Sequence, residues 1–229
     1  MNKHLTIIMA CILATTCLTS CSKRMIDPPP PILGVDYVYP TYSNLFTGNY
    51  WIYEDYIVGD NMADSATGVY DSVYVDKDTI VNSLVYYRLN KPSYWGTNEY
   101  TSIYLRDSAD CIVDLTGRIR FSASNFSSIL YSKYLINPLV SPVDSLAWVT
   151  ATMTDRDKML TTPAGMFRTS SYTITWMMHP YFARFGPTTR KQYTRYAAGV
   201  GMVSETLDFF TVIPTYVERR LVRYKAAVR

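Results

Sequence analysis

Short runs of tyrosine, valine, isoleucine and threonine, each bounded by turn-forming residues, most strongly limit the fold of residues 41–229. The chain has 21 tyrosines, and aspartate outnumbers glutamate by 15 to 4. Aromatic and β-branched side chains suit pleated strands, whereas aspartate, asparagine, serine and glycine favour the turns between them. We therefore predict an all-β domain with few helices, built as an antiparallel meander.

Twelve segments fit this pattern, and several of them alternate between apolar and polar side chains. In one of them Tyr172, Ile174 and Trp176 share a face, because strand side chains alternate with a period of two. The triplet Asp76-Lys77-Asp78 predicts a tight connection, and residues 125–139 fit either a short helix or a long loop. The predicted strands are Tyr50–Val58, Val69–Val75, Thr79–Val81, Leu84–Leu89, Tyr100–Arg106, Cys111–Leu115, Arg118–Ser122, Leu146–Thr152, Phe167–Met177, Gln192–Tyr196, Met202–Leu207 and Tyr216–Lys225.

The N-terminus has the pattern of an export signal. Lys3 supplies a positive charge, and Leu5–Leu18 is apolar but short for a membrane span. Small residues then precede Cys21, and this ending resembles the lipobox of bacterial lipoproteins. The resemblance implies cleavage before Cys21 and lipidation of that cysteine, with palmitate among the expected acyl chains. The alternative is an ordinary secretory signal that contains a cysteine by chance.

Three regions follow from this interpretation. Residues 1–20 are a lipoprotein signal peptide, residues 21–40 are the lipidated cysteine and a proline-rich tether, and residues 41–229 are a single β domain. Pro28–Pro31 predicts stiff polyproline II structure within the tether. The predicted location is the cell envelope, anchored by lipid to the outer membrane. Because Lys23 and Arg24 are not an acidic run, the periplasmic face is favoured over the cell surface.

The charges are unevenly distributed along the chain. Residues 21–150 carry 9 Lys and Arg against 14 Asp and Glu, whereas residues 151–229 carry 12 against 5. One interpretation is a basic face for phosphate-bearing lipid headgroups. The other is that acidic and basic strands pair within one sheet. The net charge of +3 gives no reason to expect a nucleic-acid partner.

Three motifs resemble a known family in their order. They are Gly48-Asn49-Tyr50-Trp51-Ile52-Tyr53, Thr162-Pro163-Ala164-Gly165-Met166-Phe167 and Tyr196-Ala197-Ala198-Gly199-Val200-Gly201-Met202-Val203. Together they resemble β-rich lipoproteins of the Bacteroidota type, mostly of unassigned function. The resemblance implies a curved sheet or an open half-barrel and supplies no catalytic residue. By themselves, the motifs predict a core position for Trp51, a turn at Pro163, and either a bulge or a close backbone contact around Val200.

A second pattern resembles the protein O-glycosylation motif of the same bacterial group. It consists of aspartate, then serine or threonine, then a small or apolar residue. The alternative explanation is that aspartate and serine are common in turns. The candidate acceptor residues are Ser65, Ser72, Thr79, Ser108 and Ser145.

The search for catalytic and metal-binding patterns predicts neither an enzyme nor a metal site, and no cofactor. His179 is the only histidine after residue 20, too few for a histidine-rich zinc site, and Cys111 is the only cysteine beyond Cys21. Gly199-Val200-Gly201 begins like a dinucleotide fingerprint, but Ser204 stands in place of the third glycine. A calcium loop at Asp76 would need glycine where Val81 stands.

Aromatic side chains are the remaining indication of function. The loop at Tyr94 and Trp95 is the best single candidate for a surface that binds a protein or a glycan. We predict a non-catalytic role in binding or assembly, with an envelope protein as partner in addition to the lipid-anchored membrane. The alternatives are a carrier or sensor of an apolar ligand held in the concavity of the sheet, and a cryptic hydrolase.

Overall fold

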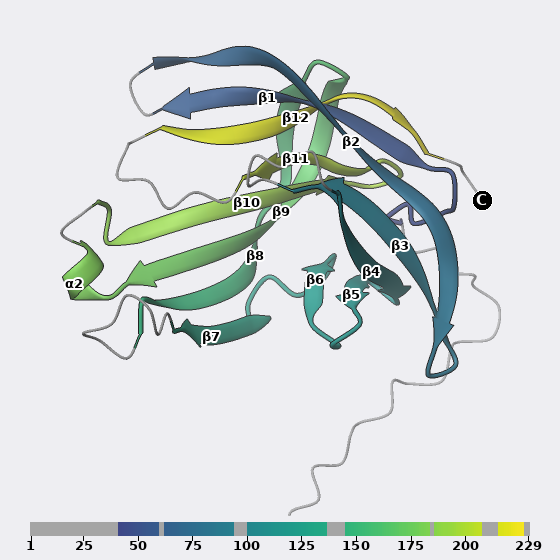
Figure 1. Ribbon diagram of the computed structural model, residues 1–229, viewed down its shortest axis with the longest axis horizontal. Coiled ribbons are helices and arrows are strands. Elements are labelled where there is room, and N and C mark those ends of the chain that lie inside the picture. Colours follow the sequence, from purple (N-terminus) through teal and green to yellow (C-terminus); the bar gives the residue numbers. More distant parts are fainter. Residues whose placement is uncertain are drawn as a thin grey trace, which may run out of the picture. The chain divides into compact units, whose positions relative to one another are not determined.

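The computed structural model describes residues 41–59, 62–93, 100–136, 145–183, 186–207 and 215–226, all within the unit Val38–Arg229. In these residues twelve strands form one antiparallel sheet (Figure 1). The strands are β1 (Tyr50–Gly59), β2 (Met62–Val81), β3 (Leu84–Pro92), β4 (Tyr100–Ser108), β5 (Cys111–Asp114), β6 (Ile119–Ser122), β7 (Tyr131–Leu135), β8 (Ala147–Thr162), β9 (Gly165–Met178), β10 (Thr189–Ala197), β11 (Gly201–Thr206) and β12 (Thr215–Lys225).

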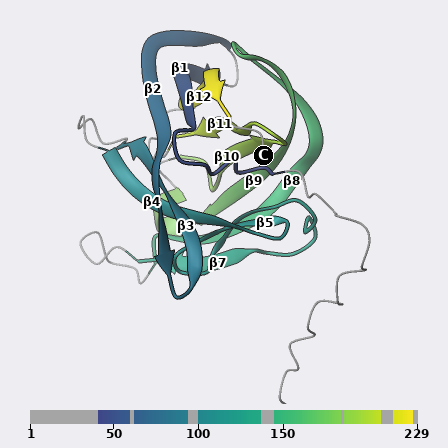
Figure 2. The same cartoon turned by 90° about the vertical axis from the view of Figure 1, so that its right-hand side faces the viewer.

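The sheet is a meander in which sequence neighbours pair. The spatial order is β6-β5-β4-β3-β2-β1-β12-β11-β10-β9-β8-β7, so β1 pairs with β12 and the two edges are β6 and β7. The sheet curls strongly (Figure 2), and its β6 edge reaches back to β8, where the Ser122 amide donates to the Met153 sulfur at 3.4 Å. The predicted all-β class, antiparallel meander and curved sheet are therefore confirmed.

Three local predictions were wrong. Asp76-Lys77-Asp78 is not a connection: β2 runs on to Val81 through a bulge after Val75, and Asp76 is paired with Arg88 of β3. The strand predicted to end at Thr152 continues to Thr162 through a second bulge, where Asp155 and Asp157 adopt positive φ. Residues 125–139 contain strand β7, and the only helix in the described residues is the single turn α2 (Pro180–Ala183).

The core lies on the inner face of the curled sheet, and the predicted role of Trp51 in it is confirmed. Trp51 is 3% exposed, and its indole nitrogen donates to the Val200 carbonyl at 2.7 Å. A Cβ at Gly201 would lie 3.0 Å from that indole, and the positive φ of 102° also favours glycine there. The predicted close backbone contact around Val200 is therefore made with Trp51. Pro163 and Ala164 form the expected turn between β8 and β9, and the Ala164 amide donates to Leu221 of β12.

The uneven charge of the sequence is balanced across neighbouring strands. Arg219 of β12 pairs with Asp71 of β2 at 3.0 Å, and Arg220 pairs with Asp64 at 2.5 Å. Both pairs span β1, which lies between β2 and β12. The structure therefore favours the second interpretation of the charge pattern, in which acidic and basic strands meet within one sheet.

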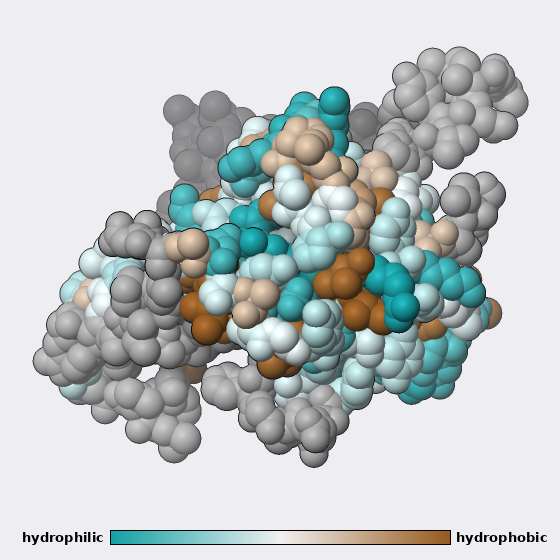
Figure 3. Space-filling view, turned by 90° about the horizontal axis from the view of Figure 1, so that it is seen from above, coloured by the Kyte–Doolittle hydropathy of each residue, from teal (hydrophilic) through white to brown (hydrophobic). Residues whose placement is uncertain are grey.

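The outer face of β2 is rich in exposed tyrosine, as the alternation predicts. Tyr70 and Tyr74 are exposed, whereas Val73 and Val75 are buried. Val69 is also exposed, although strict alternation would place it on the face of Val73 and Val75. The face seen in Figure 3 carries hydrophobic residues in small separate groups among hydrophilic ones. No helix in the described part of the chain has the length and apolar character needed to cross a membrane.

Candidate functional site

The inner side of the curled sheet encloses a cavity of about 320 Å³, here called the hollow. Its volume falls at the small end of the range for ligand pockets, roughly 300–1,000 Å³. Strands β3, β4 and β6–β11 all contribute to its walls. Its charged lining residues are Lys91, Arg118, Arg120, Lys133 and Glu205; the aromatic ones are Tyr131, Tyr172, Trp176 and Tyr196; the others are Ile103, Leu105, Val149, Ile174, Gln192, Thr194 and Thr206.

Strand alternation explains how these side chains come to face one another. Tyr172, Ile174 and Trp176 of β9 all point into the hollow, which confirms the face predicted from the sequence. On the neighbouring strand β10, Gln192 and Thr194 do the same. The Trp176 indole nitrogen donates to the Gln192 amide oxygen at 2.8 Å, so the two strands fix the orientation of the indole.

A smaller apolar pocket of about 70 Å³ adjoins the hollow and shares Lys91, Ile103, Leu105, Tyr196 and Glu205 with it. Trp51, Tyr53 and Val73 are among its other lining residues. Burial raises the pKa of Tyr53 and Tyr196, so both phenols keep their protons. The Tyr53 hydroxyl donates to the Met202 carbonyl at 2.8 Å. This arrangement extends the hollow with an apolar end.

A row of alternating charges begins at Lys91 and Glu205, which line both spaces. Lys91 donates to Glu205 at 3.1 Å, and Glu205 lies 3.9 Å from the fully buried Arg219. Arg219 in turn pairs with Asp71 at 3.0 Å and lies under the ring of Tyr53. Glu205 is the one carboxylate among the lining residues, and it is held between two cations. It is therefore placed as a structural counterion rather than as a free acid or base.

Arg118 has a different environment. Its guanidinium carbon lies 3.6 Å from the centroid of the Tyr131 ring, a cation–π distance, and one terminal nitrogen donates to the Tyr172 hydroxyl at 3.1 Å. Its Nε is buried and has no hydrogen-bond partner among the described residues. Arg118 is thus fixed in place while part of its donor capacity remains unused.

Asp114 at the end of β5 organises the turn that presents Arg118 and Arg120. One carboxylate oxygen accepts hydrogen bonds from the Thr116 amide at 2.9 Å, the Thr116 hydroxyl at 2.7 Å and the Arg118 amide at 3.1 Å. The other oxygen accepts from Nε of Arg120 at 2.8 Å. Burial opposes ionisation of Asp114, but the bonds from Thr116 and Arg120 outweigh it and hold the pKa of this carboxyl below its usual value.

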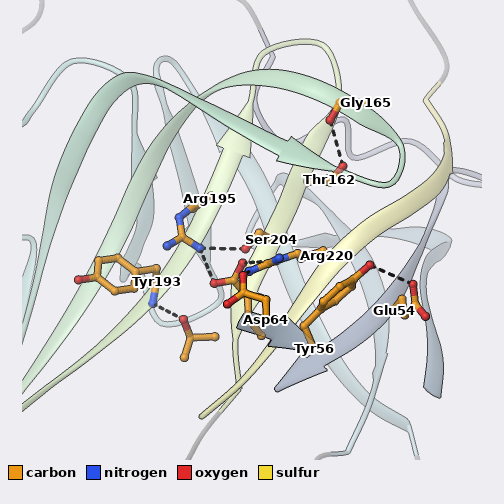
Figure 4. Close-up of polar contacts among 11 residues, drawn as sticks. Glu54, Tyr56, Asp64, Thr162, Gly165, Tyr193, Arg195, Ser204 and Arg220 are labelled. Atoms are coloured by element: carbon orange, nitrogen blue, oxygen red, sulfur yellow. Dashed lines mark hydrogen bonds and ion pairs between the residues drawn. The ribbon is translucent and has the colours of Figure 1, made fainter. Parts of the chain in front are cut away.

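A second ion-pair cluster lies on β2, β10, β11 and β12 (Figure 4), and none of its residues lines the hollow. Arg195 donates to the Ser204 hydroxyl at 2.9 Å and to Glu218 at 3.0 Å. Glu218 also accepts from Arg220, which reaches Asp64. Because each of these charges has a partner of opposite sign, we interpret this cluster as stabilising the sheet.

The site residues predicted from the sequence lie away from the hollow or outside the described residues. Cys21, Tyr94 and Trp95 are outside them. Ser65 is exposed, although it lies within β2 and not in a turn. Ser72 is half-buried with its hydroxyl 2.9 Å from that of Tyr100. Thr79, Ser108 and Ser145 are also half-buried.

The two residues examined for chemistry have local roles. His179 precedes α2, and its Nδ1 accepts a hydrogen bond from the Tyr181 amide at 3.2 Å. Cys111 is half-buried, and burial raises the pKa of its thiol. Neither residue lines the hollow. In the described residues no group of three or more histidine, cysteine, aspartate and glutamate side chains is placed to hold a metal ion.

Sequence reasoning did not identify the cations of the hollow. Arg118 and Arg120 are two residues apart, so strict strand alternation would place both on one face and Phe121 on the other. Because Phe121 is buried, that pattern would put the two arginines on the outer face. The pairing of β5 with β6 shifts register, so that Val113 faces Ile119 and Ile112 faces Phe121, leaving Arg120 in a bulge. Because a bulge interrupts alternation, no periodicity in the sequence places Arg120 at the hollow.

Comparisons with known proteins give similarity in structure alone. No protein-family model matches the chain, and no curated protein matches its sequence. A protein from Parabacteroides distasonis described as a lipoprotein is similar with a TM-score of 0.43 and 14% identity, over 80% of this chain and 98% of that one. An exported protein of Bacteroides fragilis with a YmcC-like fold is similar with a TM-score of 0.39 and 13% identity, over 82% and 100%. At such identities neither protein transfers a function to this chain.

Proposed function

We propose that this chain is a non-catalytic protein of the cell envelope, anchored by lipid on Cys21, that binds a small molecule in the hollow. The observation that supports binding is the cavity of about 320 Å³ on the inner face of the sheet, lined by eight aromatic or aliphatic side chains and eight charged or polar ones. In a ligand site apolar walls provide affinity and polar groups fix the orientation of the ligand, and the hollow offers both.

The state of the charged groups supports a binding role over catalysis. Glu205, the carboxylate of the hollow, is engaged by Lys91 and Arg219, and Arg120 is engaged by Asp114. A general acid or base needs a proton-donating or proton-accepting group that is free to reach the substrate. The lining is also more polar than the apolar concavity expected from the sequence, so the ligand class changes from purely apolar to amphipathic.

A dye-binding experiment tests the proposal. The mature chain, residues 21–229 with Cys21→Ser to prevent lipidation, is titrated with the neutral apolar dye N-phenyl-1-naphthylamine. We expect saturable fluorescence enhancement from one site. Thr194→Trp, which places an indole in the hollow, should abolish it. Lys191→Trp, which adds the same indole on the outer face of β10, should leave it unchanged.

The outcomes separate clearly. Loss of binding in Thr194→Trp but not in Lys191→Trp, with unchanged far-ultraviolet circular dichroism in both, supports the hollow as the site. An absence of saturable binding in the unsubstituted chain, or equal binding in both variants, would contradict the proposal.

A second candidate function is assembly with another envelope protein through the tyrosine face of β2. It is favoured by the exposed tyrosines Tyr70, Tyr74 and Tyr100, with the rings of the last two 5.7 Å apart. Tyrosine provides large contact areas with a polar end and is enriched at protein interfaces. Cross-linking in cells with a photoreactive residue at position 70 tests this role, and recovery of the uncoupled protein alone would count against it.

A further inference from the structure

The positive charge of the hollow is only partly neutralised. Four cations and one carboxylate line it. Arg120 pairs with Asp114, and Lys91 pairs with Glu205. Within the described ranges no carboxylate forms an ion pair with Arg118 or Lys133. A cation held in a partly buried site without a counterion favours the entry of an anion.

The donor geometry of Arg118 indicates which anion. A guanidinium has five N–H donors in a planar fork, and among the described residues only one terminal nitrogen of Arg118 donates a hydrogen bond, to Tyr172. The Tyr131 ring lies against the guanidinium, and Nε is buried, so the edge formed by the two terminal nitrogens is the part of the fork left for a ligand. Two parallel N–H bonds from such an edge match the two oxygens of a carboxylate.

Lys133 adds charge on the same side of the hollow. Its ammonium lies 6.0 Å from the centroid of the Tyr131 ring, so Tyr131 is shared between Lys133 and Arg118. Lys133 is exposed on the edge strand β7, whereas Arg118 is half-buried. An anion at this position would have one well-desolvated partner and one solvent-exposed partner.

The remaining walls specify the rest of the ligand. Trp176, Ile174 and Val149 provide apolar surface, and the small apolar pocket extends the space beyond Tyr196. A ligand that is charged throughout would leave this surface without a partner. A volume of about 320 Å³ also limits the ligand to a small molecule.

We propose that the ligand is a small organic acid, a carboxylate joined to an apolar body, and that Arg118 binds the carboxylate while Lys133 strengthens its attraction. This inference rests on the proposed binding function of the hollow and names its ligand class. The apolar body lies against Trp176 and the aliphatic wall.

The test uses two probes that differ only in charge, 2-naphthoate and its neutral amide, 2-naphthamide, with affinities measured by equilibrium dialysis. We expect the unsubstituted mature chain to bind the acid more tightly than the amide. Arg118→Gln should weaken binding of the acid by roughly tenfold or more, since hydrogen bonds to a charged group contribute about 1.5–3 kcal/mol. Binding of the amide should be nearly unchanged. Lys133→Gln should weaken binding of the acid by a few-fold.

Arg106→Gln is a matched control. Arg106 also lies over a tyrosine ring, that of Tyr86 at 5.7 Å, and its Nε donates to that hydroxyl at 3.2 Å. Its neighbour Leu105 lines the hollow, so Arg106 itself points to the other face of β4. The Arg106 variant should bind both probes as the unsubstituted chain does.

Each result bears on one claim. If neither probe binds, the proposed function fails. If both bind with equal affinity and Arg118→Gln changes neither, the hollow binds ligands but the acid specificity is wrong. If Arg118→Gln does not fold, the decision rests on Lys133→Gln and on salt. Rising ionic strength should then weaken binding of the acid and not of the amide. Equal affinities of the two probes at low salt would overturn the inference.

Discussion

The guanidinium carbon of Arg118 lies 3.6 Å from the centroid of the Tyr131 ring, and this contact joins the two ends of the sheet. Arg118 immediately precedes β6, one edge strand, and Tyr131 begins β7, the other. No backbone hydrogen bonds pair β6 with β7 in the described strands. The same side chains that bring the edges together therefore also form a wall of the hollow.

Replacing Tyr131 tests this closure. Tyr131→Leu removes the ring on which Arg118 lies, and it should lower the free energy of unfolding by about 1 kcal/mol. It should also weaken 2-naphthoate binding, because the guanidinium loses its fixed plane. Tyr131→Phe keeps the ring and is the control. Urea denaturation measures the stability, and equal stability of the Leu and Phe variants would show that the ring does not hold the edges together.

Asp114 predicts a dependence of stability on pH. Its pKa is held below the usual carboxyl value by Thr116 and Arg120, against the opposing effect of burial. Its contribution should therefore be complete above the unfolded value of about 3.9 and be lost as pH falls through the lower folded value. We expect Asp114→Asn to be less stable than the unsubstituted chain at pH 6.

The difference should shrink as the pH falls below about 4, since the unsubstituted carboxyl is then increasingly protonated. Urea midpoints at a series of pH values provide the measurement. Asp78→Asn is a suitable comparison, because Asp78 is exposed and forms no described ion pair. A constant difference between Asp114→Asn and the unsubstituted chain down to pH 2.5 would contradict the role given to this carboxylate.

Two glycines give a matched pair for the packing of Trp51. Gly201→Ala places a methyl group 3.0 Å from the indole and forces alanine into a positive φ of 102°. Gly199→Ala has a positive φ of 73° but meets no atom within 4 Å. Both should be destabilised by about 1–2 kcal/mol through backbone strain, and Gly201→Ala by about 1–3 kcal/mol more through overpacking. A lower thermal unfolding midpoint for Gly199→Ala than for Gly201→Ala would refute the close packing of Gly201 against Trp51.

Exposure ranks the candidate glycosylation residues. Ser65 is exposed, whereas the hydroxyl of Ser72 lies within hydrogen-bonding distance of Tyr100. We expect mass spectrometry of the protein from its own cells to find a glycan on Ser65. Ser65→Ala should remove that mass, and Ser72→Ala should not. An unmodified Ser65 peptide would refute the prediction.

The sheet could be predicted from local sequence because local chemistry determines most of it. Tyr172, Ile174 and Trp176 alternate with threonines, and the face they share is the one that lines the hollow. Trp51 is buried as expected. Strand β7 was missed because three of its five residues are exposed, so it lacks an apolar stripe, and it is ordered by pairing with β8.

The site could not be predicted because it depends on contacts between distant segments. Arg118, Lys133 and Trp176 are on three separate parts of the sheet, and only its curl brings them to one cavity. The bulge at Arg120 also breaks the alternation that placed Trp176 correctly. Asp76 and Asp78 are a further example, because the sequence predicts a turn there and the structure has a bulged strand. Asp76 pairs with Arg88 on the neighbouring strand, a contact that the local sequence does not reveal.

The most direct test of the proposed site is the nuclear magnetic resonance signal of the Arg118 Nε–H group in the mature chain during titration with 2-naphthoate. Assigned by comparison with Arg118→Gln, this signal should shift in proportion to occupancy and remain unmoved by 2-naphthamide, while that of Arg106 stays constant in both titrations. Saturating 2-naphthoate that leaves the Arg118 signal where it began, or moves the Arg106 signal equally, would contradict the assignment of this arginine as the group that binds the acid.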